Sequence, residues 1–280
     1  MKYKLLAIDL DGTLLTTNKK LPKENIKVLR LLYKKGIEIV IATGRRYWSA
    51  KEFVKKLDID LVVMANNGNI ARRIQDDKVL ISKYLDRNDF ITLVKESNRL
   101  GLNPIMYVDH YEEGYDLIIE LDDEKKKYSP YISKNIFRHK EIDDILKYDG
   151  NKTLAVCYEG DYETLEYFQN KLKKEYPSKF NTHIMNNNSK IGPLLEVMNP
   201  LGSKWLSLKK YAEDKGIAAN QIVAIGDDNN DIEMIEKAGL GIGMKNSTQE
   251  VKAVADIITK KTNDEAGVAY ILKDIFNICI

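Results

Sequence analysis

The pair Asp9 and Asp11 is the first feature of this sequence that points to chemistry. The apolar run at residues 5–8 precedes it and Gly12 follows it, so a buried strand is predicted to end at two carboxylates and a turn. This arrangement suits a nucleophile beside a second acid, with a cation between them. We therefore expect the partners of these two acids at the ends of later strands.

Three further groups of polar residues stand where strands are predicted to end or helices to begin. They are Thr43 with Gly44, Lys204, and Asp227 with Asn230 and Asp231. Apolar runs at residues 37–42 and 222–225 precede the first and the third group. Because the carboxyl ends of parallel strands share one edge of a sheet, all of these side chains can meet above that edge.

Three of these residues, Asp9, Asp11 and Asp227, would crowd negative charge into one pocket. Two unit charges about 4 Å apart repel by roughly 4 kcal/mol at an effective dielectric constant near 20. Either some of the acids stay protonated or a cation neutralises them. An oxygen-only ligand set suits Mg²⁺, and no nearby His or Cys argues for zinc.

The remaining groups fit a phosphate. Thr43 offers a hydroxyl, the N–H groups around Gly44 open a helix, Lys204 supplies a positive charge and Asn230 supplies an amide donor. A metal ion and such donors around a phosphoryl group are what phosphoryl transfer needs.

The acids then take distinct roles. Asp9 is expected to attack phosphorus and form an aspartyl phosphate. Asp11 is expected to protonate the leaving oxygen and then deprotonate the attacking water. Asp231 is expected to hold Lys204 by charge pairing.

Each of these residues also has a structural interpretation. Asp-Gly pairs are common in turns, strand-to-helix connections often use Thr and Gly, and a lone lysine is usually solvated. The combination, rather than any single residue, therefore carries the interpretation. Asp228 is interpreted as a solvated loop acid, and Arg45 is left out of the site as a structural residue.

The elements that must position these residues form an α/β chain. Strand and helix patterns alternate in the first and last thirds, which predicts a Rossmann-like, doubly wound parallel sheet. The middle third predicts an inserted α+β module with antiparallel pairing. We place the core at residues 1–82 and 190–280 and the inserted cap domain at residues 83–189.

The composition limits the partners of this chain of 280 residues. Its net charge of +2 does not favour nucleic acid or an acidic membrane as the main partner. Its two cysteines, Cys157 and Cys279, are far apart and are interpreted as reduced thiols of a cytoplasmic protein. No apolar run approaches the roughly 20 residues that span a bilayer.

The sequence resembles the haloacid dehalogenase-like phosphatases. Four ordered motifs carry the resemblance: residues 9–15 (DLDGTLL), 42–45 (ATGR), 203–204 (SK) and 226–234 (GDDNNDIEM). Their spacing is similar to that of the Cof-type branch, whose cap domain lies between the third core strand and the motif lysine. Residues 65–68 (ANNG) also resemble that branch.

The resemblance implies a set of ligands. It implies Mg²⁺ bound by the Asp9 side chain, the Asp11 main-chain carbonyl and Asp227. It implies phosphate contacts from the Leu10 backbone, Thr43, Gly44, Lys204 and Asn230. Trp205 departs from the pattern, because the family often has glycine after the lysine.

We therefore expect a Mg²⁺-dependent phosphatase of small phosphorylated metabolites, such as sugar phosphates or nucleotide and cofactor phosphates. Two alternatives stay open: a phosphotransferase or phosphomutase on the same scaffold, and a receiver-type signalling domain with a phosphorylated aspartate. Substrate choice is expected to reside in the cap. The sequence leaves the physiological substrate and the oligomeric state open.

Overall fold

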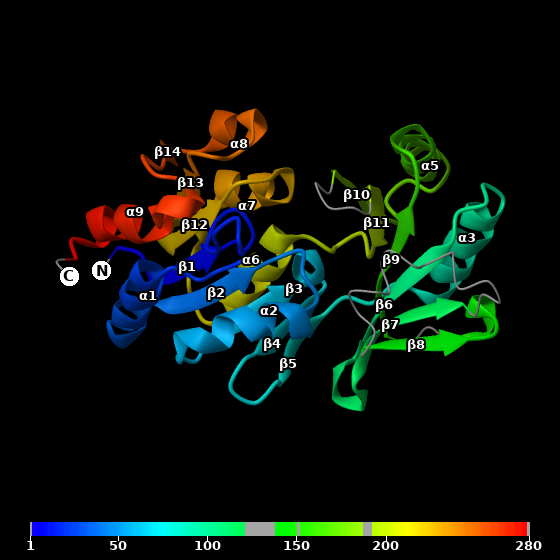
Figure 1. Ribbon diagram of the computed structural model, residues 1–280, viewed down its shortest axis with the longest axis horizontal. Coiled ribbons are helices and arrows are strands. Elements are labelled where there is room, and N and C mark those ends of the chain that lie inside the picture. Colours follow the sequence, from blue (N-terminus) through cyan, green and yellow to red (C-terminus); the bar gives the residue numbers. More distant parts are fainter. Residues whose placement is uncertain (1, 121–137, 150–151, 187–191, 279–280) are drawn as a thin grey trace. The chain divides into compact units, whose positions relative to one another are not determined.

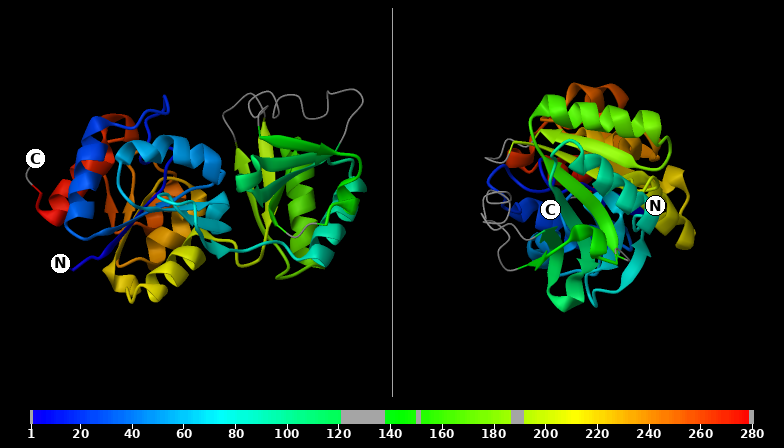
Figure 2. Two further views of the ribbon diagram at one scale, coloured as in Figure 1. Left: turned by 90° about the horizontal axis from the view of Figure 1, so that it is seen from below. Right: turned by 90° about the vertical axis from the view of Figure 1, so that its right-hand side faces the viewer.

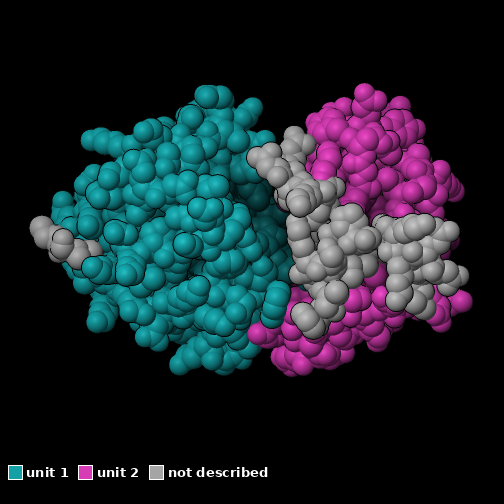
Figure 3. All heavy atoms as spheres, viewed as in Figure 1, with its two compact units in different colours: residues 1–82, 203–280 teal, residues 83–202 magenta. Residues whose placement is uncertain are grey.

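The computed structural model describes residues 2–120, 138–149, 152–186 and 192–278. The chain forms two compact units, one made of residues 1–82 and 203–280 and the other of residues 83–202 (Figure 3). Each unit has its own sheet and its own hydrophobic core. Among the described residues, no helix is both long and apolar enough to cross a membrane.

The first unit is built on a sheet of eight strands within the described part of the chain (Figure 1). Its strands are β1 Leu5–Ile8, β2 Glu38–Ala42, β3 Val62–Ala65, β4 Ile70–Arg73, β5 Val79–Ser82, β12 Ile222–Gly226, β13 Leu240–Gly243 and β14 Ile257–Ile258. Their order is β14-β13-β12-β1-β2-β3-β4-β5. The pairs from β14 to β3 are parallel, and β4 and β5 extend the sheet as an antiparallel edge. The expected parallel core is therefore confirmed.

Helices cover both faces of this sheet. They are α1 Lys23–Lys34, α2 Tyr47–Val54, α6 Lys204–Asp214, α7 Ile232–Lys237, α8 Gln249–Val254 and α9 Gly267–Phe276. Successive strand residues point to opposite faces, and Leu5 and Ala7 share a buried cluster with Leu208 of α6. Figure 2 shows α1 and α2 on one side of the sheet and α6 on the other. Both faces are thus buried, which explains the continuous apolar runs of the central strands.

The second unit contains a mostly antiparallel sheet, with the strand order β10-β11-β9-β6-β7-β8 in the described residues. Its elements are α3 Arg87–Asn98, β6 Pro104–His110, β7 Tyr115–Glu120, β8 His139–Ile142, β9 Thr153–Glu159, α5 Tyr162–Glu175, β10 Asn181–Asn186 and β11 Pro193–Met198. Only the β7–β8 pair is parallel among these described strands. Phe90 of α3 and Phe168 of α5 pack into one core with the sheet. Cys157 of β9 is buried and forms no disulfide bond with a described residue, and Cys279 lies outside the described residues.

One predicted domain boundary differs from the structure. The sequence pattern predicted that the second half of the core begins at residue 190, whereas residues up to 202 belong to the second unit. The reason is β11, which pairs antiparallel with β10 on one side and with β9 on the other. A strand in the middle of a sheet is apolar whichever sheet it joins, so its sequence alone did not reveal its partners.

Candidate active site

Asp9 stands directly after β1, in the loop that was predicted to carry chemistry. Its backbone N–H still donates to the Ile225 carbonyl of the neighbouring strand at 2.9 Å. The loop then closes on itself, because the Leu14 and Leu15 N–H groups donate to the carbonyls of Asp9 and Leu10. Asp9 is therefore held at the end of a central strand, and its side chain is buried.

Three carboxylates converge at this strand end. Asp9, Asp227 and Asp231 each offer an oxygen, and these three oxygens lie within 4.8 Å of one another. Lys204 Nζ lies 2.7 Å from Asp9 Oδ1 and 2.7 Å from Asp231 Oδ1. The Lys204 side chain is only 1% exposed, so its ammonium group interacts with these carboxylates and not with solvent. These residues come from three segments of the chain that are far apart in sequence.

Two glycines leave the space that these acids fill. A Cβ on Gly12, whose φ is +78°, would lie 2.2 Å from Asp227 Oδ2. A Cβ on Gly226 would lie 2.4 Å from the Asp231 carboxyl carbon. Asp231 is also fixed by the N–H groups of Asp227 and Asp228, which donate to its Oδ2. The cluster thus depends on backbone that approaches the carboxylates closely.

The electrostatics of the cluster reflect its burial. Burial raises the pKa of Asp9 well above its ordinary value, and the charges of Asp231 and Asp227 add to this effect while Lys204 opposes it. Burial and the charge of Asp231 raise the pKa of Asp227 to about 7. Burial alone would lower the pKa of Lys204, but Asp231 and Asp9 outweigh it and raise that pKa above its ordinary value. One lysine therefore does not balance three carboxylates.

This donor set fits a divalent cation. The three carboxylates carry three negative charges when ionised, and Lys204 offsets one of them. The ligand atoms are all oxygens, which is the set that Mg²⁺ prefers. The site can therefore hold a hard cation, as the sequence predicted for Asp9 and Asp227.

The Asp11 side chain is engaged elsewhere. Arg45 contacts both of its oxygens, with Nη2 2.7 Å from Oδ1, and Lys19 Nζ lies 2.6 Å from Oδ1. Burial raises the pKa of Asp11, but the hydrogen bonds and charges of Arg45 and Lys19 outweigh burial and leave that pKa below its ordinary value. Arg45, which was predicted to be a structural residue outside the site, is thus the main partner of Asp11.

Two of the predicted phosphate-binding residues, Gly44 and Asn230, lie close together. Thr43 is buried at the end of β2, and its hydroxyl oxygen accepts from the Arg45 N–H at 3.1 Å. A Cβ on Gly44 would lie 3.7 Å from Asn230 Nδ2 and 3.3 Å from Asn67 Oδ1. Asn230 Nδ2 in turn donates to Asn67 Oδ1 at 2.9 Å. The structure therefore brings Gly44 and Asn230 together and adds Asn67, a buried residue.

The turn Asn66–Gly68 joins this group to Lys204. The Asn67 N–H donates to the Thr43 carbonyl at 3.0 Å. On its other side, Ser207 of α6 donates its hydroxyl to the Gly68 carbonyl at 2.5 Å. Lys204 and Ser207 are three residues apart on α6, so one short turn couples the Thr43 loop to the helix that carries the lysine.

The remaining predicted residues have structural contacts. Asp228 is exposed, and its side chain caps the short turn Asn229–Asp231. Trp205 is buried in the cluster of apolar side chains under the sheet. Leu10 is buried, and its carbonyl accepts from the Leu15 N–H at 2.8 Å.

Sequence reasoning missed Thr13, whose hydroxyl donates to Asp227 Oδ1. It also assigned no role to Asn67. Two features of the sequence could have indicated them. Thr13 lies in the motif at residues 9–15, and Asn67 lies in the segment at residues 65–68 that resembles the Cof-type branch.

Comparison with known proteins places these features in a family. A model of the haloacid dehalogenase-like hydrolases matches residues 6–272. Phosphatase YwpJ of Bacillus subtilis is 26% identical, and the match covers 97% of this chain and 99% of that protein. The 5-amino-6-(5-phospho-D-ribitylamino)uracil phosphatase YcsE of the same organism is 29% identical over 95% of this chain and 93% of that protein. A haloacid dehalogenase-like hydrolase from Bacteroides thetaiotaomicron has a similar structure, with a TM-score of 0.81, 27% identity and coverage of 98% and 100%.

Proposed function

The chain belongs to the haloacid dehalogenase-like hydrolases, and from this premise we propose that it is a Mg²⁺-dependent phosphatase that works through an aspartyl phosphate on Asp9. The family resemblance inferred from the four motifs is confirmed by the match over residues 6–272. That match, together with the phosphatase names of full-length relatives, makes the chain a phosphoric monoester hydrolase. The same match argues against the alternative of a receiver-type signalling domain.

The proposed reaction has two steps. In the first, a carboxylate oxygen of Asp9 attacks phosphorus and the ester P–O bond breaks. Asp11, which must leave Arg45 and Lys19 and take up a proton when the substrate binds, gives that proton to the leaving oxygen. In the second, Asp11 takes a proton from water, the water oxygen attacks phosphorus, and the Asp9–phosphorus bond breaks. Inorganic phosphate leaves and both aspartates return to their initial states.

The other residues bind and orient the phosphoryl group. Thr43, the N–H groups at Leu10 and Gly44, and the Asn230 amide supply hydrogen-bond donors, and Lys204 supplies a fixed positive charge. Asp231 holds Lys204 through the 2.7 Å contact described above. Mg²⁺, bound by the Asp9 side chain, the Asp11 carbonyl and Asp227, would neutralise the charge that develops on the phosphoryl oxygens.

One observation carries this proposal. Asp9 and Asp227, from opposite ends of the chain, lie in one largely buried carboxylate cluster whose only cation among the described contacts is Lys204. A cluster with excess negative charge suits a divalent ion and its phosphate ligand better than a purely structural ion pair does.

The test is phosphate release from a panel of phosphomonoesters. We expect turnover with Mg²⁺, its loss with a chelator and its return when Mg²⁺ is added in excess. Asp9→Asn should lower kcat by about 10⁴-fold or more. Asp228→Asn is the matched control, because Asp228 is an exposed acid outside the cluster and should keep most of the activity. Wild-type turnover by the Asp9→Asn variant would refute the assignment of the nucleophile.

The panel should contain sugar phosphates, nucleotides and 5-amino-6-(5-phospho-D-ribitylamino)uracil. Three relatives are named as phosphatases of this last compound. Organic products should be analysed together with free phosphate. An isomerised sugar phosphate without phosphate release would indicate a mutase instead.

A further inference from the structure

A cavity lies in the first unit, at the end of the strands opposite to the carboxylate cluster. It encloses about 350 Å³, which falls within the range of about 300–1,000 Å³ found for small-molecule sites. Glu38, the first residue of β2, lines it, whereas Thr43 follows the last residue of β2. The five residues of β2 at roughly 3.3 Å each separate the two places by about 16 Å. This cavity is therefore not part of the carboxylate cluster.

Much of the cavity wall is apolar and aromatic. The side chains that give this character are Tyr33, Leu61, Val62, Leu80, Ile81 and Tyr211. Two of them are large and exposed, Tyr33 at 40% and Leu80 at 38%. A ligand with an apolar body would cover this surface.

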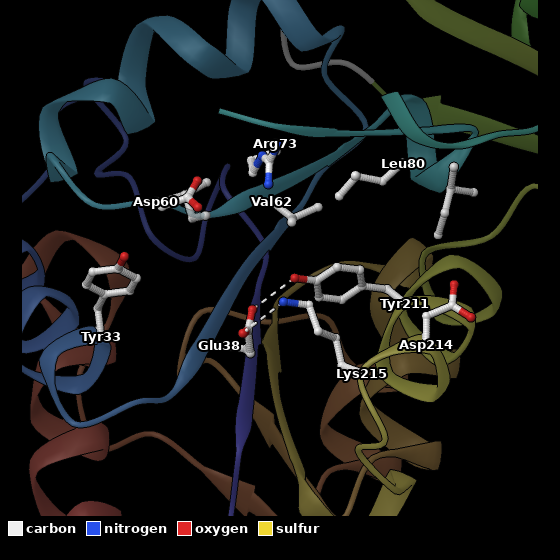
Figure 4. Close-up of a pocket in the computed structure, with 11 residues that line it drawn as sticks. Tyr33, Glu38, Asp60, Val62, Arg73, Leu80, Tyr211, Asp214 and Lys215 are labelled. Carbon is white, nitrogen blue, oxygen red and sulfur yellow. Dashed lines mark hydrogen bonds and ion pairs between the residues drawn. The ribbon is translucent and has the colours of Figure 1, made fainter. Parts of the chain in front are cut away.

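Most charged groups on the wall already have partners. Glu38 accepts hydrogen bonds from the Tyr211 hydroxyl at 2.9 Å and from Lys215 Nζ at 3.1 Å, as the dashed lines in Figure 4 show. Tyr211 and Lys215 are four residues apart along the chain, so both reach the same carboxylate. Glu38 therefore brings no uncompensated charge to the cavity.

The same holds for two other charged residues of the wall. Arg73 donates to both oxygens of Asp76, with Nε 2.9 Å from Oδ1. Asp214 forms an ion pair with Lys210 at 2.5 Å. These pairs are neutral, so they neither attract nor repel a charged ligand strongly.

Asp60 is different. Its Oδ1 is buried and has no hydrogen-bond partner among the described residues. The charge of Asp60 contributes to the raised pKa of Arg73 on the same wall. Arg73, however, donates its hydrogen bonds to Asp76. Asp60 as a whole is only partly buried and lines the cavity, so a bound cation can reach its carboxylate and supply a positive charge and a hydrogen-bond donor. Figure 4 shows Asp60 and Tyr33 on the left of the view, and both line the cavity.

We propose that this cavity is a second ligand site, which binds a small organic monocation. Its ammonium group would lie at Asp60, and its apolar or aromatic body would cover Leu80 and the tyrosine rings. One unpaired carboxylate calls for one positive charge, and tyrosine faces bind cations in addition to apolar groups. The site takes an alkylammonium or arylammonium compound and does not depend on the phosphatase chemistry.

The test is calorimetric titration of the full chain, in the presence of Mg²⁺, with a graded series of probes. Ethylamine, cyclohexylamine and 2-phenylethylamine share the ammonium group and increase in apolar area. 2-Phenylethanol is the neutral counterpart of the last. We expect saturable binding that tightens along the amines, and at least about tenfold weaker binding of the alcohol.

Two variants locate the bound probe. Asp60→Asn removes the charge at nearly constant shape and should weaken 2-phenylethylamine binding at least about tenfold. Glu213→Gln makes the same charge change on an exposed face of α6 outside the cavity and should leave binding unchanged. The proposal is overturned if no amine binds saturably, if the alcohol binds equally well, or if Asp60→Asn binds as wild type does. Self-association of the wild-type chain that Asp60→Asn abolishes would also overturn it, because the occupant would then be a basic side chain of a second copy.

Discussion

At the scale of single residues, the site depends on how its buried charges are paired and on the space that glycines leave for the carboxylates. Lys204 contacts two of the three clustered carboxylates and is almost fully buried. Breaking such a buried arrangement by removing one partner typically costs about 3–5 kcal/mol, because the opposite charge stays buried. The lysine is therefore a structural requirement of the cluster, in addition to its proposed role as a phosphate ligand.

Gly12 allows a direct test of the space requirement. Gly12→Ala should lower the free energy of unfolding by about 1–2 kcal/mol, because alanine is strained at a φ of +78°. It should also lower kcat/KM by roughly 10²-fold, because the new Cβ would displace Asp227. Gly36→Ala is the matched control, since its φ is +81° but nothing lies within 4 Å of the added Cβ.

Urea denaturation and phosphate release measure the two effects separately. Gly36→Ala should lose similar stability and keep its activity. Equal activities of the two variants would contradict the view that the close approach to Asp227 makes Gly12 necessary.

The sequence predicted that Asp9, Asp11 and Asp227 share one pocket and that Asp231 pairs with Lys204, but it did not predict the partners of the Asp11 side chain. In the structure Asp9 and Asp227 do lie together at the ends of parallel strands, and Asp231, paired with Lys204, takes the third place that was expected for Asp11. The pairing of Asp11 with Arg45 and Lys19 depends on side-chain directions in a turn that contains a positive φ. Residue types and spacing do not encode those directions.

At the scale of elements, α6 and the turn Asn66–Gly68 position the site. Ser203 begins α6, because its hydroxyl oxygen accepts from the Leu206 N–H at 3.0 Å and its hydroxyl donates to Glu233 at 2.7 Å. The close fit of Gly68 against the Ser203 carbonyl fixes the turn on the first residues of the helix. Lys204 is therefore oriented both by its helix and by its two ion pairs.

Removing the helix cap should separate these two contributions. Ser203→Ala should lower the free energy of unfolding by about 1 kcal/mol, because the Leu206 N–H loses its acceptor. Activity should change little, since Asp9 and Asp231 still hold Lys204. Ser203→Thr keeps the acceptor and should recover most of the stability. A threonine variant as unstable as the alanine variant would show that the cap does not matter.

The elements themselves were largely predictable, because both faces of the parallel sheet are covered and its strands are continuous apolar runs. The hydroxyl cap of α6 was also readable from Ser203. The partners of β11 were not, because a run such as residues 194–198 is equally suited to a central strand of either sheet. Local patterns define an element, whereas its neighbours depend on the whole chain.

At the scale of the molecule, each unit has its own hydrophobic core. Both tryptophans, Trp48 and Trp205, belong to the first unit, so their fluorescence reports on that unit alone. Far-ultraviolet circular dichroism reports on both. The expectation that the second unit selects the substrate stays a prediction.

Glu96 provides a perturbation confined to the second unit. Its carboxylate, only 6% exposed, accepts from Lys171 Nζ at 2.5 Å and from the Tyr176 hydroxyl at 3.2 Å. The hydrogen bond from Lys171 lowers the pKa of Glu96, and burial opposes this effect without cancelling it. Because the folded pKa lies below the unfolded value near 4.5, the pair stabilises the unit above about pH 4.5. This stabilisation is lost as the pH falls through the folded pKa.

Glu96→Gln should therefore lower the free energy of unfolding of the second unit by about 1–3 kcal/mol at pH 7. The difference from wild type should shrink as the pH falls from about 4.5 through the lower folded pKa, because the unfolded carboxylate is protonated first and the folded carboxylate last. The change should appear in the circular dichroism transition in urea and not in the tryptophan transition. Glu166→Gln, an exposed position on α5, should shift neither. If Glu96→Gln moves both transitions together, the two units unfold as one cooperative structure.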